Sequence, residues 1–221
     1  MTRVLVLRPQ PDGDSTVERA RARGLDAVAV PLFEVEPVSW EAPQAASFSG
    51  VLLTSANAVR HGGEKLQGFR GLKTYAVGSA TAKAAIAAGF DVAATGDSGV
   101  DRLLGSIESD LKLFHPCGEH RREPREPRQK ITSITVYRAR EVHAPDLSAA
   151  SGSVALIHSR RAGRRFAELI TERDSISVAA IGDDAADAVG KGWRTVVAAE
   201  KPSDDALLAL AATLCDKPEP K

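Results

Sequence analysis

Cysteine is scarce in this chain of 221 residues, and long apolar runs are missing. The two cysteines, Cys117 and Cys215, lie far apart without metal-type spacing, which fits a reducing compartment. We therefore expect a cytoplasmic protein. The apolar run near the start, Val4–Leu7, is far too short for a signal peptide or a membrane span. It predicts a buried strand instead.

A surplus of charge of either sign is also missing. Lysine and arginine number 29, aspartate and glutamate number 29, and the formal net charge is zero. This balance argues against nucleic acid or an anionic membrane as the main partner. An anionic small molecule held by local groups remains compatible with it.

Common catalytic fingerprints are absent as well. The sequence has no GxGxxG, GxxxxGK(S/T), HExxH or GxSxG motif. His115 and His120 lie five residues apart, but surface or capping positions explain them better than a metal pair, and we expect no metal site. No acid–base dyad or triad is visible, and Cys117 has no evident base beside it. These absences indicate an unusual ligand rather than a nucleotide.

What the chain does have is an alternation of short apolar runs with alanine-rich helical windows. The runs are continuously apolar, which is typical of strands covered on both faces, and the alternation predicts doubly wound parallel sheets. The expected strands are Val4–Leu7, Ala27–Val30, Val51–Leu53, Thr74–Val77, Val92–Ala94, Leu111–Phe114, Val154–Ile157, Val178–Ile181 and Thr195–Ala198.

The middle and last thirds of the sequence repeat each other. Ser55 corresponds to Ser159, Gly78 to Gly182, and Asp101 to Asp205, each pair being 104 residues apart. A long constant offset predicts two similar α/β domains rather than a solenoid. Two such domains would enclose a cleft, where ligands usually bind.

Two segments alternate polar and apolar residues and flank the first repeat. They predict exposed strands, 33–38 and 135–142, on which the chain leaves one domain and returns to it. The expected domains are therefore a discontinuous one, residues 1–32 with 143–217, and an inserted one, residues 39–134. The charged segment Gly118–Lys130 contains Pro124 and Pro127 and predicts a short or irregular helix. It is either a solvated face or a basic lip on the cleft.

Small polar residues follow most predicted strands, including His115–Gly118 after the run that ends at Phe114. In parallel sheets this is where ligands bind, because helix N-termini there favour anions. Helix capping explains each residue equally well when taken alone. Tyr137 lies on a crossing strand, where its phenol suits hydrogen-bond donation to a leaving oxygen or simple packing at the hinge.

The residues in this order resemble the uroporphyrinogen-III synthase family. The segments that carry the resemblance span almost the whole chain: Val6–Pro9, Leu53–Val59, Ala76–Ala82, Ser98-Gly99, Leu103-Leu104, Pro116–Glu119, Val136–Arg138, Ile181-Gly182, Pro202-Ser203 and Ala206–Leu208. The resemblance implies two flavodoxin-like or similar α/β domains joined by a two-stranded linker. It also implies a monomer without metal or cofactor.

The implied activity is closure of hydroxymethylbilane to uroporphyrinogen III, with loss of water and inversion of the D ring through a spiro-pyrrolenine. Tyr137 matches the family's tyrosine that assists departure of the hydroxyl. The expected substrate-binding residues are Arg8, Thr54, Ser55, Asn57, Gly78, Ser79, Thr81, Ser98, Gly99, Gly118, Ser159, Arg160, Gly182 and Ser203. A transient contact with the preceding enzyme of the pathway is a further expectation.

The chain also departs from the family pattern at Leu7, His158 and Ala185, where threonine is common. We therefore expect the inserted domain to supply most side-chain contacts, and the discontinuous domain mainly backbone amides and arginines. The alternative function is a non-catalytic sensor or binding protein for an anionic small molecule. A phosphosugar or nucleotide enzyme is a third possibility, disfavoured by the missing phosphate fingerprints.

Overall fold

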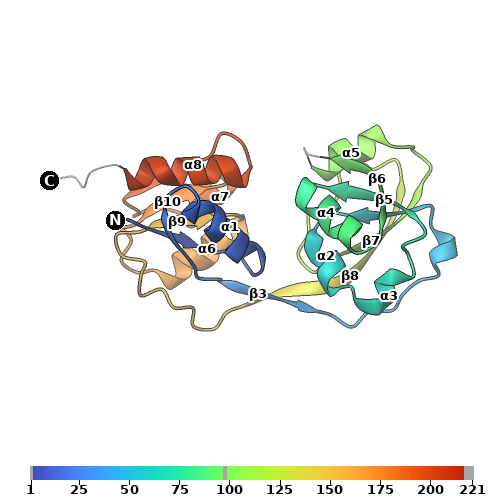
Figure 1. Ribbon diagram of the computed structural model, residues 1–221, viewed down its shortest axis with the longest axis horizontal. Coiled ribbons are helices and arrows are strands. Elements are labelled where there is room, and N and C mark those ends of the chain that lie inside the picture. Colours follow the sequence, from blue (N-terminus) through green and yellow to red (C-terminus); the bar gives the residue numbers. More distant parts are fainter. Residues whose placement is uncertain (1, 97–98, 217–221) are drawn as a thin grey trace. The chain divides into compact units, whose positions relative to one another are not determined.

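The computed structural model describes residues 2–96 and 99–216 (Figure 1). The chain divides into two units, each built around one sheet: unit 1 is Met1–Glu34 with Glu141–Lys221, and unit 2 is Val35–Arg140. Within the described residues, no helix combines the length and the apolar character needed to cross a membrane.

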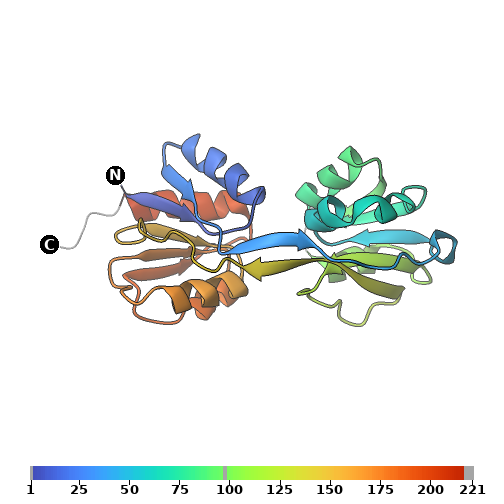
Figure 2. The ribbon, with the colours of Figure 1, turned by 90° about the horizontal axis from the view of Figure 1, so that it is seen from below.

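Unit 1 contains a five-stranded parallel sheet with the strand order β11-β10-β9-β1-β2. Helices α1 and α8 pack together on one face, around Val17 and Leu207, and Figure 2 shows α6 and α7 on the other face. The elements of this unit are β1 (Arg3–Val6), α1 (Asp12–Arg21), β2 (Asp26–Ala29), β9 (Val154–Ile157), α6 (Arg160–Leu169), β10 (Ser177–Ala180), α7 (Asp183–Val189), β11 (Thr195–Ala198) and α8 (Asp204–Cys215).

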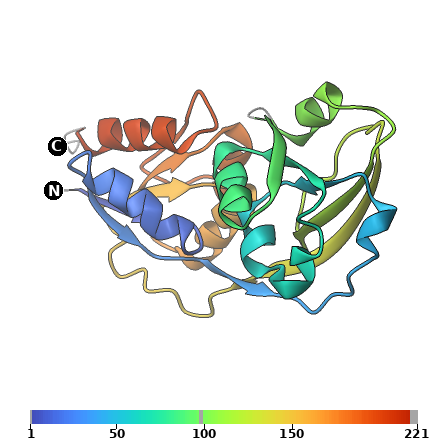
Figure 3. The ribbon, with the colours of Figure 1, turned by 45° about the vertical axis from the view of Figure 1, so that its right-hand side comes forward.

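Unit 2 contains a six-stranded sheet with the order β3-β8-β7-β4-β5-β6. Strands β4 to β8 pair in parallel, and Figure 3 shows the long β8 beside β7. The elements are β3 (Phe33–Pro37), η1 (Ala45–Ser47), β4 (Gly50–Leu53), α2 (Ala56–His61), α3 (Gly63–Gln67), β5 (Lys73–Val77), α4 (Ser79–Ala87), β6 (Asp91–Gly96), α5 (Val100–Ser106), β7 (Lys112–Gly118) and β8 (Lys130–Glu141).

Helices cover both faces of the second sheet and explain its apolar strands. On one face, residues of α2, α3 and α4 pack against Phe114 and Val51, and Phe114 lies 4.3 Å from Phe69 between ring centroids. On the other face, α5 packs against Leu52 and Leu113. All four residues of β4 are buried, as expected for a strand between two helical layers. The prediction of two doubly wound α/β units is confirmed.

The repeat extends to whole elements. Six pairs begin 104 residues apart: β4 and β9 at 50 and 154, α2 and α6 at 56 and 160, β5 and β10 at 73 and 177, α4 and α7 at 79 and 183, β6 and β11 at 91 and 195, and α5 and α8 at 100 and 204. In unit 2 the strands next to β4 are β7 and then β8, whereas in unit 1 those places are taken by β1 and then β2. The N-terminal β-α-β segment therefore completes the second copy of the repeat.

Two local predictions after Phe114 are wrong. The expected loop His115–Gly118 belongs to strand β7. Its ladder with β4 covers Leu113 and Phe114, whereas its ladder with β8 extends to Gly118, so Pro116 lies where the strand has edge-like pairing and proline is tolerated. The expected helix between Gly118 and Lys130 is an irregular segment, because Pro124 and Pro127 each remove a helical hydrogen-bond donor.

Candidate functional site

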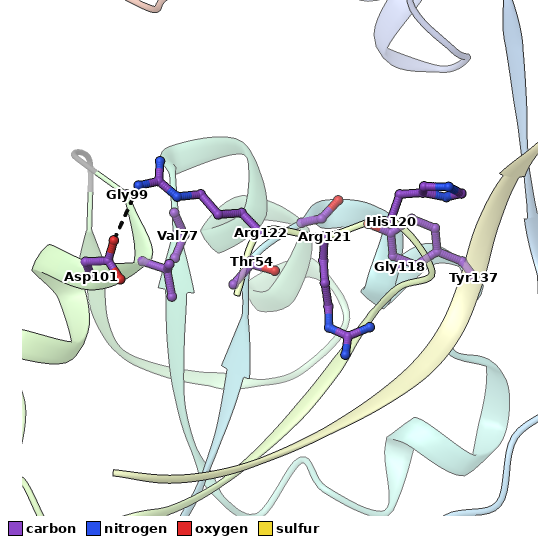
Figure 4. A pocket seen from close by; sticks show the side chains of 11 residues that line it. Thr54, Val77, Gly99, Asp101, Gly118, His120, Arg121, Arg122 and Tyr137 are labelled. Carbon is purple, nitrogen blue, oxygen red and sulfur yellow. Dashed lines mark ion pairs between the residues drawn. The ribbon is translucent and has the colours of Figure 1, made fainter. Parts of the chain in front are cut away.

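The carboxyl ends of the unit 2 strands surround a pocket of about 320 Å³ (Figure 4). The pocket lies where the strand order reverses between β4 and β7, which is the place where open parallel sheets bind ligands. Its lining residues come from β5, α5, β7, β8 and the segments that follow β4, β6 and β7: Thr54, Ser55, Val77, Gly99, Val100, Asp101, Gly118, His120, Arg121, Arg122 and Tyr137.

Tyr137 and Gly118 are paired across strands β8 and β7. A β-carbon at Gly118 would lie 2.7 Å from Cζ of Tyr137, which is closer than any real contact of this kind. Glycine at this position therefore lets the tyrosine ring lie directly over β7. This contact explains why Pro116-Cys117-Gly118 ends in glycine and fixes where the phenol stands in the pocket.

The Tyr137 phenol is neutral at physiological pH. Burial raises the pKa of Tyr137 above its usual value of 10.0, and a hydrogen bond with the Ser55 side chain opposes part of that rise. The phenol can therefore donate a hydrogen bond or a proton into the pocket. The Cys117 thiol nearby is buried, and burial raises its pKa, so it remains a protonated thiol rather than a nucleophile.

Thr54 is positioned by a buried polar chain. Its hydroxyl oxygen lies 3.0 Å from Nε2 of His115, and Nδ1 of His115 lies 3.1 Å from the hydroxyl of Ser133. The His115 side chain is inaccessible to solvent, and this burial lowers its pKa to about 4. His115 is thus a neutral support that fixes the Thr54 hydroxyl beside the pocket.

We expect His115 to make the folded state sensitive to acid. Its pKa is about 4 in the folded protein against the ordinary 6.5, so below pH 6.5 the unfolded chain binds a proton that the folded chain refuses. The free energy of unfolding should fall by up to about 3 kcal/mol between pH 6.5 and pH 4 and be unaffected by this group above pH 6.5. Urea unfolding of wild type and His115→Asn across this range checks it. Equal pH slopes in the two proteins would contradict the prediction.

A second pocket, of about 470 Å³, lies at the strand ends of unit 1. Its lining includes Ser159, Arg160 and Gly182, which correspond to Ser55, Ala56 and Gly78 at the offset of 104. Asp183 and Asp184 line it as well, in the first turn of α7. The lining of the unit 1 pocket therefore has two aspartates against one arginine, whereas the lining of the unit 2 pocket has two arginines and a histidine against one aspartate.

The strand-order reversal of unit 1, between β1 and β9, is occupied by an ionic cluster centred on Asp204. Asp204 accepts from the Thr16 hydroxyl at 3.0 Å, lies 2.7 Å from Nε2 of His158 and pairs with Arg8 at 3.5 Å and with Arg19. Burial lowers the pKa of His158 to about 3. The neutral imidazole donates its N–H to the carboxylate. At the offset of 104, His158 corresponds to Thr54 of unit 2 and Asp204 corresponds to Val100. Both Thr54 and Val100 line the unit 2 pocket.

The sequence-predicted site residues fall into four groups. Thr54, Ser55, Gly99, Gly118 and Tyr137 meet in the unit 2 pocket, and Ser159, Arg160 and Gly182 line the unit 1 pocket. The third group, within the described residues, lines neither pocket. Arg8 pairs with Asp12 and Asp204, and the Ser203 side chain caps α8. The backbone N–H of Asn57 donates to the Ser55 hydroxyl, and Gly78, Ser79 and Thr81 lie at the start of α4. Ser98 lies outside the described residues.

Sequence reasoning missed Asp101, His120, Arg121 and Arg122 as individual pocket residues. The only available signal was the basic composition of Gly118–Lys130, which is compatible with a lip of a site. Val77 and Val100 were missed because apolar residues at strand ends and helix starts resemble ordinary core positions.

Two α/β units with polar pockets at their strand ends, joined by the paired strands β3 and β8, define a two-domain α/β binding protein or enzyme. Residues 14–209 match the family model described as "Uroporphyrinogen-III synthase HemD". The chain therefore belongs to the uroporphyrinogen-III synthase family. The comparison with curated protein sequences found no match.

Solved structures share this fold. The crystal structure of uroporphyrinogen-III synthetase from Helicobacter pylori 26695 is 20% identical and superposes with a TM-score of 0.69, covering 96% of this chain and 99% of that one. A mutant uroporphyrinogen III synthase from the extremely thermophilic bacterium Thermus thermophilus is 17% identical, with a TM-score of 0.55, covering 98% of this chain and 100% of that one. At these identities the likeness shows a common fold.

Proposed function

We propose that this chain closes hydroxymethylbilane to uroporphyrinogen III, acting as a cyclising lyase of tetrapyrrole (haem) biosynthesis. Membership of the family favours this function over a non-catalytic sensor for an anionic molecule. The structural observation that carries the proposal is the protonated Tyr137 phenol, fixed over Gly118 in a pocket that arginines line. Such a pocket suits a substrate that carries carboxylates and must lose a hydroxyl group.

In the proposed reaction, the phenol of Tyr137 donates a proton to the departing hydroxyl group. The carbon–oxygen bond breaks, the hydroxyl leaves as water, and an azafulvene remains. The substituted α-carbon of the D ring then bonds to the methylene carbon of the azafulvene and forms the spiro-pyrrolenine. The bond between that α-carbon and the bridge to the C ring breaks, and the free α-carbon of the D ring bonds to the bridge instead, which inverts the ring. The proton that left with the water is balanced by the proton that the α-carbon of the D ring loses after the final closure, when that pyrrole regains aromaticity, and transfer of this proton restores the phenol. One proton donor is enough for this departure, and the proposal therefore involves no metal or cofactor.

The binding role of the pocket is mainly orientation. The hydroxyl departs readily, and control of the attacking carbon decides the isomer, so fixed contacts matter more than a strong acid or base. We propose that Thr54, Ser55, Gly99 and Gly118 contact the substrate in unit 2, and that Ser159, Arg160 and Gly182 do so in unit 1. The residues at the start of α4, Gly78, Ser79 and Thr81, together with Arg8, Asn57, Ser98 and Ser203, remain binding candidates.

We also propose where the enzyme acts and what it binds. We infer a cytoplasmic protein, because the buried Cys117 and the half-buried Cys215 are free thiols and suit a reducing compartment. A monomeric state is what the family resemblance implies. Hydroxymethylbilane is the proposed partner, and neither nucleic acid nor a membrane is needed. Because this substrate closes spontaneously to the wrong isomer, transient contact with the enzyme that makes it would be useful.

One assay tests the function directly. Purified protein is mixed with freshly generated hydroxymethylbilane, the products are oxidised, and the uroporphyrin isomers are separated. We expect isomer III in excess over the isomer I that forms without enzyme. Formation of isomer I alone would contradict the synthase proposal and leave the non-catalytic binding protein as the better explanation.

A further inference from the structure

Arg122 lines the unit 2 pocket and pairs with a carboxylate of the same lining. In Figure 4 its side chain runs from the segment after β7 past Thr54 and Val77 toward Asp101 at the start of α5. An Nη atom of Arg122 lies 3.6 Å from Oδ2 of Asp101, and the Arg122 side chain is 70% exposed. The Arg122 guanidinium is therefore in contact with both solvent and the carboxylate of Asp101, another residue of the pocket lining.

This ion pair is weak and exchangeable. At 3.6 Å it is longer than a charge-assisted hydrogen bond, and exposed pairs of this kind contribute little because water and salt screen them. Arg121 behaves differently, since its guanidinium pairs with Glu123 at 2.7 Å and its side chain is only 27% exposed. Arg122 is thus the arginine of this pocket whose present partner a stronger anion can replace.

We propose that Arg122 is a carboxylate-binding residue of the unit 2 pocket, and that Asp101 is the internal anion that holds it in place until a substrate carboxylate takes over. The inference rests on the proposed function for the identity of the substrate, because each pyrrole ring of hydroxymethylbilane carries carboxylate side chains. A guanidinium suits them through paired, parallel N–H donors.

Asp101 can release Arg122 without releasing the segment that carries it. Its other oxygen, Oδ1, accepts a hydrogen bond of 2.7 Å from the backbone N–H of Arg125. The buried Gln129 side chain anchors the same segment by donating to the carbonyls of Leu104 and Glu108. Exchange of partners at Arg122 therefore leaves the irregular segment attached to α5.

The repeat provides a matched control inside the same chain. Asp205 corresponds to Asp101 at the offset of 104, and it pairs with Arg23 at 2.6 Å. Arg23 follows α1, in the connection between β1 and β2, just as Arg122 lies in the connection between β7 and β8. Among the described residues, neither Arg23 nor Asp205 belongs to the lining of the unit 1 pocket. The two ion pairs therefore share the equivalent aspartate and join corresponding connections, although Arg122 directly follows a strand and Arg23 follows a helix, and of these four described residues only Arg122 and Asp101 line a pocket.

The test compares Arg122→Gln, Asp101→Asn, Arg23→Gln and Asp205→Asn in steady-state assays with hydroxymethylbilane. We expect Arg122→Gln to raise KM about tenfold with kcat changed less than about twofold, because one charged contact to the bound substrate is lost. Asp101→Asn should lower KM by up to about fivefold, since the competing carboxylate is gone while the amide oxygen still accepts from Arg125. Both unit 1 variants should match wild type.

Opposite changes in KM for Arg122→Gln and Asp101→Asn distinguish substrate binding by Arg122 from a role of the ion pair in supporting the segment. An unchanged KM in Arg122→Gln, or a KM raised equally by Arg122→Gln and Asp101→Asn, would overturn the proposal. A titration with uroporphyrin III, followed by porphyrin fluorescence, tests carboxylate binding by Arg122 independently of whether the protein is a synthase. If wild type yields only isomer I but binds the porphyrin, weaker binding by Arg122→Gln alone supports the site. Equal binding by all variants, or no binding by wild type, overturns it.

Discussion

Tyr137→Phe should lower kcat about a hundredfold while leaving the fold and the KM for hydroxymethylbilane nearly unchanged. The substitution removes only the phenolic oxygen, and proton donation to a leaving group typically contributes a factor of this order or more. The ring would still pack over Gly118, so the shape of the pocket is retained. Because burial raises the pKa of Tyr137, the wild-type enzyme should not lose activity through this group until the pH exceeds 10.

Tyr75→Phe is the control, since Tyr75 is the only other tyrosine and lies buried in the core of the same unit. Stopped-flow consumption of hydroxymethylbilane gives kcat and KM for both variants, and circular dichroism checks the fold. Equal turnover in wild type and Tyr137→Phe would remove the phenol from the mechanism. A matching loss in Tyr75→Phe would attribute the effect to packing of unit 2.

Asp204→Ala is expected to destabilise unit 1 by about 3 kcal/mol. The substitution leaves the charges of Arg8 and Arg19, and the N–H of the buried His158, without their shared carboxylate. Removing one partner from a largely buried cluster is costly, because the buried N–H of His158 and the Arg8 guanidinium, which is 27% exposed, lose an acceptor that water replaces only in part. The Asp204 side chain is 13% exposed, so water compensates little.

The two tryptophans allow this effect to be localised. Trp193 stacks on Phe166 in unit 1, and Trp40 stacks on Phe114 in unit 2. In a Trp40→Phe background, urea unfolding followed by fluorescence reports on unit 1 alone. Asp205→Ala is the neighbouring control, because its side chain is 72% exposed and Arg23 is its ion-pair partner. Equal midpoints for the two variants would contradict a stabilising role of the cluster.

The strands were predictable because burial on both faces demands continuous apolar runs, and the repeat was predictable because matching residues keep a constant offset of 104. Val51–Leu53 and Val154–Ile157 are such runs, and both are central strands with no exposed residue. The end of β7 was not predictable in the same way. Whether Pro116 ends a strand depends on which neighbours the strand has at that level, and strand pairing is not visible in a single sequence.

Part of the candidate site was predictable for a similar reason. Thr54, Ser55 and Gly118 follow or end strands whose carboxyl ends must meet in a parallel sheet. Arg122 lies in an irregular segment, and nothing local shows that it turns toward Asp101 on the preceding helix. The ion pair of Arg8 was not predictable either: Arg8 lies at a strand end, and its partner Asp204 lies near the other end of the chain.

The discontinuity of unit 1 has a consequence for the order of folding. Val4 of β1 pairs with Val154 of β9, and the whole of unit 2 lies between them in the sequence, whereas Gly50 and Leu113 pair within unit 2. Contacts distant in sequence form slowly, because the loop between them must close first. Once unit 2 has folded, the hydrogen bond between the Val38 N–H and the Val136 carbonyl holds its two ends together and shortens that loop. We therefore expect unit 2 to fold first and to speed formation of the unit 1 sheet, so that slow folding of unit 2 would delay both units.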